Sequence, residues 1–188
     1  MELYLIRHTT PAVQQGVCYG QTEVNVTELF LEEAEQVRTK LAGIAPVACY
    51  SSPLQRCARL AATLDAGEPQ HDARLKEMHF GDWEMQPWDN IPRQELDRWG
   101  NDYVDAAPPG GETYGQLHRR ATHFLNDLTC SKHVGPVLVV THAGVIRALL
   151  AEVLNLPLRE AFRFYLDFGG VTKLRFDGSF PVVAYVNR

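Results

Sequence analysis

Two short apolar runs at opposite ends of the chain each lead into a histidine. Residues 3–6 are followed by Arg7 and His8, and residues 137–140 are followed two positions later by His142. Each run is typical of a short buried strand. Because ligands in open α/β sheets bind outside the carboxyl ends of the strands, the sequence predicts that Arg7, His8 and His142 share one site.

Two more residues belong to the same candidate site. Arg56 stands one turn into a predicted helix that follows Ser52, and Glu77 lies in the segment 75–84. Another helix is predicted directly after His142, and its first backbone N–H groups favour an anion. Each residue alone has a simpler interpretation, since an arginine on a helix is usually solvated and a histidine at a strand end is often structural. The combination is what indicates chemistry.

That combination suits phosphoryl transfer. Guanidinium groups present paired donors that match the oxygens of a phosphate monoester. A neutral imidazole is a competent nucleophile near neutral pH, because its ordinary pKa is close to 6.5. A carboxyl group that holds a proton can protect the leaving alkoxide. Arginines and a second histidine neutralise charge without a metal, and the sequence has no HExxH or Cys/His zinc spacing. We therefore expect neither a metal nor a cofactor.

The composition is that of an ordinary globular protein. The 188 residues are 45% hydrophobic and 22% charged, which predicts one substantial core and a single domain over residues 1–188. The formal net charge of −5 argues against a general nucleic-acid-binding protein, which would show a basic face. It leaves room for an anionic substrate, because a cleft can concentrate positive charge inside an acidic protein.

The sequence also predicts a protein without a membrane or secretory segment. No apolar run approaches the roughly 18 residues of a membrane span, and the first residues lack the basic and apolar regions of a signal peptide. The four cysteines form no CxxC pair, so reduced thiols in a cytoplasmic protein are the expectation. No oligomeric state follows from the sequence.

Hydrophobic periodicity and chain breakers indicate the elements that must position the candidate site. Strands are predicted at residues 2–7, 47–50, 136–141, 171–176 and 182–186, and helices at residues 28–42, 53–66, 112–128 and 144–154. Ser51 and Ser52 are expected to supply the N-cap of the second helix, with Pro53 in its first turn. The β-α-β-α opening favours a parallel sheet.

Residues 67–111 are broken by glycines and prolines into short pieces. A connection of this length within a compact domain is usually functional. We therefore expect this stretch to form a lid or a substrate-binding segment.

Five short motifs follow one another along nearly the whole chain. They are Arg7-His8, Ser-Pro-Leu-Gln-Arg at 52–56, Leu-Lys-Glu at 75–77 with Phe-Gly-Asp-Trp-Glu at 80–84, Gly-Gly-Glu at 110–112, and Val-Val-Thr-His-Ala-Gly at 139–144. In this order they resemble the histidine phosphatase superfamily, in its phosphoglycerate-mutase-like branch. Each motif is weak alone, and the ordered set is specific. The resemblance implies an α/β fold, a three-layer α/β/α sandwich with a mostly parallel central sheet.

The resemblance implies the two catalytic residues. His8 is the expected nucleophile, which becomes phosphohistidine. Glu77 is the expected proton donor and then the base that activates water. Glu84 competes for the acid role, but the Leu-x-Glu placement favours Glu77 and leaves Glu84 a structural role.

The phosphate-binding residues are implied in the same way. Arg7, Arg56 and His142 are expected to bind the phosphoryl oxygens. The helix start at Ala143 and Gly144 is expected to add a backbone N–H.

Some positions depart from the superfamily's usual pattern. Thr10 stands where an acidic residue is common, Glu23 replaces an aspartate, and Met85 follows Trp83-Glu84 in place of a glycine. These changes affect loop shape and substrate choice more than the phosphate pocket.

Two stretches look like the α-ribazole phosphatase subfamily of cobalamin biosynthesis: Arg-His-Thr at 7–9 with Gly-Val-Cys-Tyr-Gly-Gln-Thr at 16–22, and Glu-Met-His-Phe-Gly-Asp-Trp-Glu-Met at 77–85. That subfamily removes the 5′-phosphate from α-ribazole phosphate, a nucleotide with a benzimidazole base. The resemblance implies a small-molecule phosphomonoester as the partner. Tyr19, Gln21 and Ala143 are candidate substrate contacts.

Two alternatives stay open. A phosphoglycerate mutase or a broad-specificity small-molecule phosphatase would use the same scaffold, although such mutases typically carry extra segments around the active site and this chain is short. A non-catalytic phospho-ligand-binding protein would need neither His8 nor Glu77, and both are present. Phosphate release, measured against bisphosphoglycerate-dependent mutase activity, separates these readings.

Overall fold

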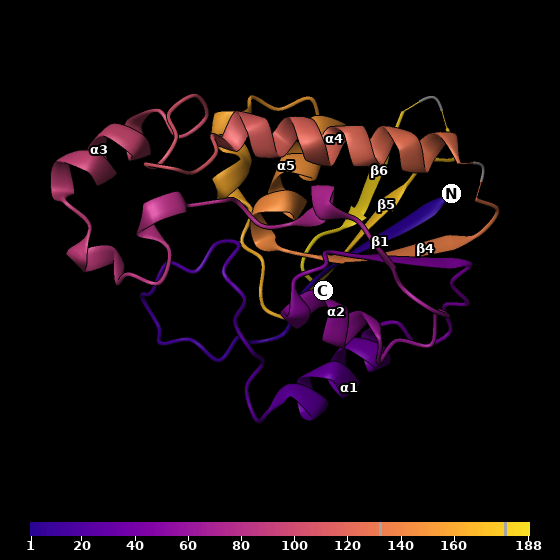
Figure 1. Cartoon of the computed structure of the whole chain (residues 1–188). Helices are drawn as coiled ribbons and strands as arrows, with labels where there is room; N and C mark the ends of the chain where they lie inside the picture. Colours follow the sequence, from indigo (N-terminus) through magenta and orange to yellow (C-terminus); the bar gives the residue numbers. More distant parts are fainter. Residues whose placement is uncertain (132, 179) are drawn as a thin grey trace.

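The computed structural model describes residues 1–131, 133–178 and 180–188, and its centre is a six-stranded sheet (Figure 1). The strands are β1 (Glu2–Arg7), β2 (Ala48–Ser51), β3 (Gln70–His71), β4 (Pro136–Thr141), β5 (Val171–Arg175) and β6 (Val182–Tyr185). Their order across the sheet is β3-β2-β4-β1-β5-β6. The first four strands run parallel, whereas β5 is antiparallel to both of its neighbours. The predicted mostly parallel sheet is confirmed.

Alternating side chains along the strands build a core on each face of this sheet. Leu3 and Leu5 of β1 belong to the core formed with α4 (Tyr114–Cys130) and α5 (Ala143–Val153). Tyr4 and Ile6 belong to the opposite core, formed with α1 (Phe30–Lys40) and α2 (Gln55–Ala61). Figure 1 shows α4 and α5 on one side of the sheet and α1 and α2 on the other. The three-layer arrangement predicted from the sequence is confirmed.

The register between β1 and β4 brings the two predicted histidines to one edge. Arg7 lies opposite Thr141 in the parallel ladder. The backbone N–H of His8 then donates to the carbonyl oxygen of Thr141 at 3.0 Å. His8 and His142 therefore leave the sheet side by side, although 134 positions separate them in the sequence.

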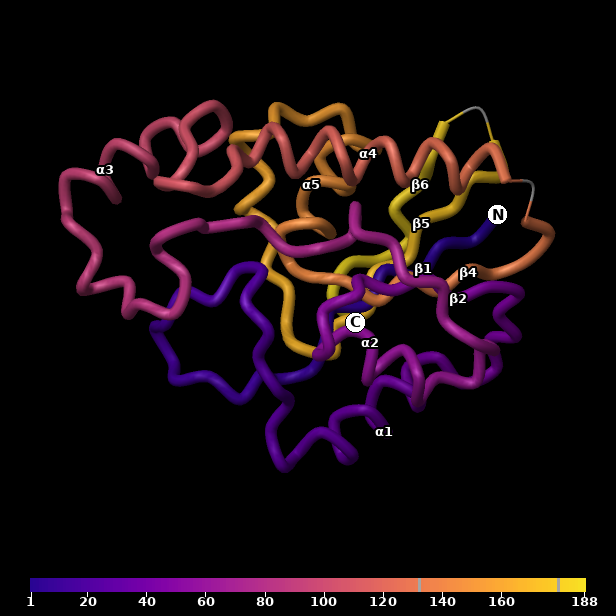
Figure 2. Tube along the Cα trace, in the orientation of Figure 1, coloured from indigo at the N-terminus to yellow at the C-terminus, as the bar shows by residue number. Residues whose placement is uncertain are grey.

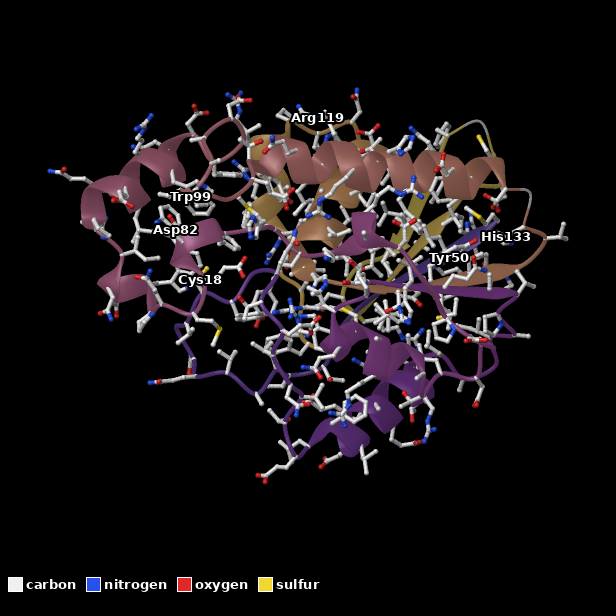
Figure 3. The ribbon with its side chains drawn as sticks, in the orientation of Figure 1. Cys18, Tyr50, Asp82, Trp99, Arg119 and His133 are labelled. Carbon is white, nitrogen blue, oxygen red and sulfur yellow. The ribbon has the colours of Figure 1, made fainter. Side chains whose placement is uncertain are left out.

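The segment after β3 packs against the first loop of the chain. Met85 N–H donates to the carbonyl oxygen of Cys18 at 2.6 Å, and Trp88 N–H donates to that of Gly16 at 2.9 Å. Figure 2 shows the two segments running side by side. A small separate core fills the space between them and α3 (Arg93–Asn101), with residues Cys18, Phe80, Trp83, Trp88, Ile91, Leu96 and Trp99. Figure 3 shows Cys18, Asp82 and Trp99 close to one another in this part of the molecule. The role of residues 67–111 as a lid or a substrate-binding segment stays a prediction.

Several short elements escape the sequence patterns. The periodicity predicts neither the two-residue strand β3 nor helix α3, because glycines and prolines interrupt the region that contains them. Short 3-10 helices occur at Ala73–Leu75, Gly81–Trp83, Trp88–Asn90 and Leu158–Arg163. Within the described ranges, no helix is long and apolar enough to cross a membrane.

The predicted serine cap of α2 is wrong. The helix begins at Gln55 and ends at Ala61, its N-cap position is Leu54, and no side chain caps it there. Ser51 is the last residue of β2, and Pro53 precedes the helix. Leu54 has an extended backbone and the helix begins only after it, so both serines lie too early in the chain to cap it. The Glu23 carboxylate instead accepts the N–H of Gln55 at 3.0 Å, which suits the positive end of a helix.

Candidate active site

His8 and His142 form the centre of the candidate site. Their ring centroids are 5.1 Å apart in an edge-to-face arrangement. His8, His142 and Arg56 are each at most 1% exposed. Polar side chains this deeply buried need partners, so the contacts of each one indicate its state.

The ring of His8 is held in one tautomer. Its Nδ1 lies 2.7 Å from the carbonyl oxygen of Thr9. A carbonyl oxygen only accepts, so Nδ1 carries the proton and donates it there. Burial first, and then the positive charges of Arg56 and Arg7, hold the pKa of His8 well below its ordinary value. The imidazole is therefore neutral near pH 7, with a lone pair on Nε2.

His142 occupies the N-cap position of α5. Its Nε2 lies 2.9 Å from the hydroxyl oxygen of Ser52 and 3.4 Å from Sγ of Cys57. Burial first, followed by the neighbouring His8 and Arg56, lowers the pKa of His142 well below the ordinary value. Burial also raises the pKa of the Cys57 thiol, so that His142 is surrounded by neutral groups on this side.

Two arginines bring positive charge to the histidines, and the main chain holds both in place. Arg7 Nη1 donates to the carbonyl oxygen of Leu166 at 2.5 Å. Arg56 Nη1 and Nη2 donate to the carbonyl oxygens of Thr22 and Gly20 at 3.0 and 2.6 Å. The Nε atoms of both arginines are buried and have no hydrogen-bond partner in the described structure. Unpaired cationic donors beside a neutral imidazole are suited to an anion's oxygens.

The Glu77 carboxylate lies at the start of α5, beside the N–H of Gly144, two residues after His142. The N–H of Met78 donates to its Oε1 at 2.9 Å, and the N–H of Gly144 donates to its Oε2 at 3.2 Å. A Cβ at position 144 would overlap Oε1 of Glu77. Glycine at this position of the motif is therefore what allows the carboxylate to approach the helix so closely.

The main chain at Glu77 is clamped from two sides. Arg120 of α4 donates to the carbonyl oxygens of Arg74, Lys76 and Glu77 at 2.7, 2.5 and 2.9 Å, and it is paired with Glu112 at 2.6 Å. The Gln21 amide donates to the same carbonyl oxygen of Glu77 at 2.9 Å. The Gly-Gly-Glu motif thus supplies the counter-ion of the arginine that fixes the Glu77 segment.

Glu84 ties two loops together. Its carboxylate accepts the N–H groups of Gln21, Thr22 and Phe80 at 2.9, 2.7 and 3.0 Å and the hydroxyl of Thr22 at 2.5 Å. With four donors on its two oxygens, it fixes the loop whose carbonyl oxygens hold Arg56. This arrangement supports the structural interpretation of Glu84.

The three residues predicted to contact the substrate lie near the site, and each has different neighbours. The ring of Tyr19 lies 5.1 Å from Cζ of Arg56. Ala143 is the first residue of α5, and the N–H next to it serves Glu77. The amide of Gln21 serves the Glu77 main chain. Contact of Tyr19, Gln21 and Ala143 with substrate stays a prediction.

Sequence reasoning missed four contributors to the site: Ser52, Cys57, Arg120 and Phe168. The ring of Phe168 lies 3.7 Å from Cζ of Arg7, and its centroid lies 5.5 Å from that of His8. Ser52 belongs to the motif at 52–56, but the sequence predicts only a helix cap for it. The other three stand in no motif that the patterns single out, because their contacts arise only in the fold.

Comparison with known proteins agrees with this geometry. A family model described as "Histidine phosphatase superfamily (branch 1)" matches residues 3–188. An adenosylcobalamin/alpha-ribazole phosphatase of Escherichia coli K12 is 29% identical, over 100% of this chain and 96% of its own. The Salmonella typhimurium LT2 protein of that name is 31% identical, over 90% and 87%.

Solved structures agree as well. The crystal structure of the alpha-ribazole phosphatase from Shigella flexneri superposes with a TM-score of 0.91, at 27% identity, over 100% of this chain and 96% of that one. The family match spans nearly every described residue, and the fold is shared from end to end. The chain belongs to the histidine phosphatase superfamily, branch 1, and is a phosphatase enzyme.

Proposed function

We propose that the protein hydrolyses the 5′-phosphate ester of α-ribazole 5′-phosphate, a step of cobalamin biosynthesis, through a phosphohistidine on His8. The observation that carries the chemistry is the neutral His8 ring, protonated on Nδ1 toward Thr9 and set beside two arginines with unpaired buried donors. The names of the similar phosphatases and the motifs at 7–9, 16–22 and 77–85 support the substrate.

In the first step Nε2 of His8 attacks phosphorus and forms the N–P bond. The bond from phosphorus to the ribose 5′-oxygen breaks, and that oxygen takes a proton from the Glu77 carboxyl group. Arg7, Arg56 and His142 stabilise the charge on the three non-bridging oxygens. Because Nδ1 stays hydrogen-bonded to a carbonyl oxygen, the ring retains one orientation during attack.

In the second step water replaces the alcohol. Glu77, now a carboxylate, takes a proton from the water, whose oxygen attacks phosphorus. The N–P bond breaks, His8 becomes neutral again, and inorganic phosphate leaves. Each step returns the proton that the other used, so the cycle balances without an external acid or base. The cations involved are side chains of this protein, and no metal has a role in the scheme.

Two further proposals accompany this function. The segment 67–111 and the loop it packs against would form the wall around the bound substrate, supported by the pairing of Met85 with Cys18 and of Trp88 with Gly16. A cytoplasmic location is supported by the four cysteines, all of which are free thiols.

A substrate panel tests the proposed function. Phosphate release is measured with α-ribazole 5′-phosphate, ribose 5-phosphate, phosphoserine and 3-phosphoglycerate, together with 2,3-bisphosphoglycerate-dependent mutase activity. We expect the highest kcat/KM with α-ribazole 5′-phosphate. A higher value for another phosphomonoester would overturn the substrate, and mutase turnover above hydrolysis would overturn the reaction class.

A further inference from the structure

A cavity of about 390 Å³ is lined in part by Tyr19 and Phe168, whose rings also contact Arg56 and Arg7 of the candidate site. It is formed by the loop between residues 10 and 19 and by Phe168. Cavities that take small molecules have volumes of about 300–1,000 Å³. The cavity is therefore large enough for an organic group, and none of the five residues with a proposed catalytic or phosphate-binding role lines it.

Two aromatic rings are shared between this cavity and the phosphate site. Phe168 lines the cavity and packs on Arg7 at 3.7 Å and on His8 at 5.5 Å. Tyr19 also lines it and lies 5.1 Å from Cζ of Arg56. These two rings connect the cavity to the arginines that are expected to hold the phosphate.

The cavity carries no charge. All of its lining side chains lie in the described part of the chain, and none is acidic or basic. Pro11, Val13 and Val17 add apolar surface to the two rings, and glutamines 14 and 15 add neutral amides. Thr10, at a position where the superfamily commonly has an acid, donates from its N–H and hydroxyl to Glu33 at 2.8 and 2.6 Å. The lining side chains therefore offer no counter-ion to a carboxylate on the leaving group.

The Phe168 ring is presented from a fixed backbone. The N–H of Gly169 is shared between the carbonyl oxygens of Arg7 and His8, each at 3.2 Å. Lys40 Nζ donates to the carbonyl oxygen of Gly169 at 2.8 Å. Phe168 is 37% exposed, and its ring packs on Arg7, so it is covered in part and open to a ligand in part. Rings in such positions favour stacked or edge-to-face contact with a second ring.

We propose that this cavity is the leaving-group subsite, and that it selects an uncharged aromatic group, which packs against Phe168 and Tyr19. The proposal deepens the proposed function and rests on it, since a benzimidazole base linked through ribose has this chemistry. It assigns substrate choice to residues 10–19 and Phe168, apart from the side chains that bind phosphate.

The test compares four phosphomonoesters on three proteins. The substrates are α-ribazole 5′-phosphate and 1-naphthyl phosphate, which carry uncharged rings, ribose 5-phosphate, which has no aromatic ring, and 3-phosphoglycerate, which is charged. Wild type is compared with Val13→Trp, which fills the cavity, and with the matched control Val134→Trp, which places the same side chain at an exposed position outside the cavity lining.

We expect wild type to show at least a tenfold lower KM for the two aromatic esters than for the other two. Val13→Trp should raise KM for the aromatic esters about tenfold and leave KM for ribose 5-phosphate within about twofold. Val134→Trp should resemble wild type. An equal effect of Val13→Trp on all four esters, or no effect on any, would overturn the subsite.

A second variant tests the subsite at another position, so that the proposal can still be judged if Val13→Trp does not fold. Phe168→Leu keeps an apolar side chain but removes the ring, and should raise KM for the aromatic esters several-fold more than for ribose 5-phosphate. Phe162→Leu is its control, because Phe162 is similarly exposed but packs on Tyr103 and Tyr114 instead. An unchanged preference in Phe168→Leu would also contradict the proposal.

The two proposals can fail separately. If 1-naphthyl phosphate is preferred but α-ribazole 5′-phosphate is a poor substrate, the proposed substrate is wrong and the aromatic subsite stands. If α-ribazole 5′-phosphate is preferred and its preference survives Val13→Trp and Phe168→Leu, the substrate stands and the subsite is wrong.

Discussion

The Nε2 atom of His142 lies 2.9 Å from the hydroxyl oxygen of Ser52, and both side chains are fully buried. The Ser52 oxygen also accepts the N–H of Leu54 at 3.4 Å. We infer that the hydroxyl proton is given to Nε2, which places the imidazole proton of His142 on Nδ1. Ser52 is then a positioning residue that fixes which ring nitrogen of His142 can donate to a phosphoryl oxygen.

The Ser52→Ala substitution should remove the hydrogen bond that holds the His142 ring. A buried hydrogen bond contributes about 1 kcal/mol, so we expect kcat/KM to fall by roughly five- to tenfold, with the fall in the phosphorylation step. Ser51→Ala is the matched control, because Ser51 is equally buried and donates to a backbone oxygen. Equal losses in the two variants, measured by rapid-quench kinetics, would argue for a general packing effect.

The stability of the protein should fall in mild acid because His8 and His142 are buried as neutral rings. Their pKa values are lowered in the folded state, chiefly by burial. Below pH 6.5 the unfolded chain therefore binds protons that the folded chain does not. From about pH 7.5 to about pH 5.5, each such histidine should remove about 1.4 kcal/mol from the free energy of unfolding.

Urea unfolding at the two pH values measures this effect. The comparison is between the pH-dependent changes of wild type and His8→Asn, so any constant loss of stability in the variant cancels. We expect the variant to lose about 1.4 kcal/mol less than wild type over this range. The same change in both proteins would show that His8 is protonated in the folded state.

Arg120 should affect the chemistry through Glu77. It donates to three carbonyl oxygens around Glu77, and lysine has one nitrogen where arginine has a fork. Arg120→Lys should slow phosphorylation of the enzyme on the order of 10–100-fold with a sugar phosphate, because catalytic groups tolerate little misplacement. The loss should be smaller with a nitrophenyl ester, whose leaving group needs little protonation.

The control for this variant is its neighbour in the helix. Arg119 is exposed, and Figure 3 shows it on the outer side of α4. Arg119→Lys should leave the rate of enzyme phosphorylation unchanged with both substrates. A loss in Arg120→Lys that is independent of the leaving group would indicate a structural role without a link to Glu77.

Glu77 itself should show the strongest dependence on the leaving group. General acid catalysis contributes about 10²–10⁴-fold, so Glu77→Gln should lose on that order in single-turnover phosphorylation by a nucleotide substrate. The loss with the nitrophenyl ester should be smaller. Steady-state rates are less informative, because Glu77 is also the proposed base in the shared second step. A larger loss for Glu84→Gln would move the acid role to Glu84.

The sequence predicts the layers of this fold better than its loops. Alternating apolar residues and helical spacing locate the long buried elements, and β4 matches the predicted residues 136–141 from end to end. The helices of the two layers are also found, with shifts at their ends. Helix α3 is not predicted because it has no fully buried residue and only two apolar positions, Leu96 and Trp99, which pack in the small core around Trp83.

The candidate site likewise contains residues that the sequence predicts and residues that only the structure reveals. Arg7, His8 and His142 follow from strands that must end at one sheet edge, which the pairing of Arg7 with Thr141 confirms. Phe168 and Arg120 have no such signal. Phe168 reaches the site through the pairing of Gly169 with the strand end, and Arg120 reaches it through helix packing. Both depend on tertiary contacts that no local pattern encodes.

The central claim is that His8 forms the covalent intermediate, and trapping the phosphoenzyme tests it most directly. Wild type, His8→Ala and His142→Ala are mixed with ³²P-labelled substrate, quenched in base because phosphohistidine is acid-labile, and the labelled peptide is located by mass spectrometry. We predict label on His8 in wild type, no label in His8→Ala, and a reduced amount on His8 in His142→Ala. Label that persists in His8→Ala, or that maps to another residue in wild type, would contradict the account.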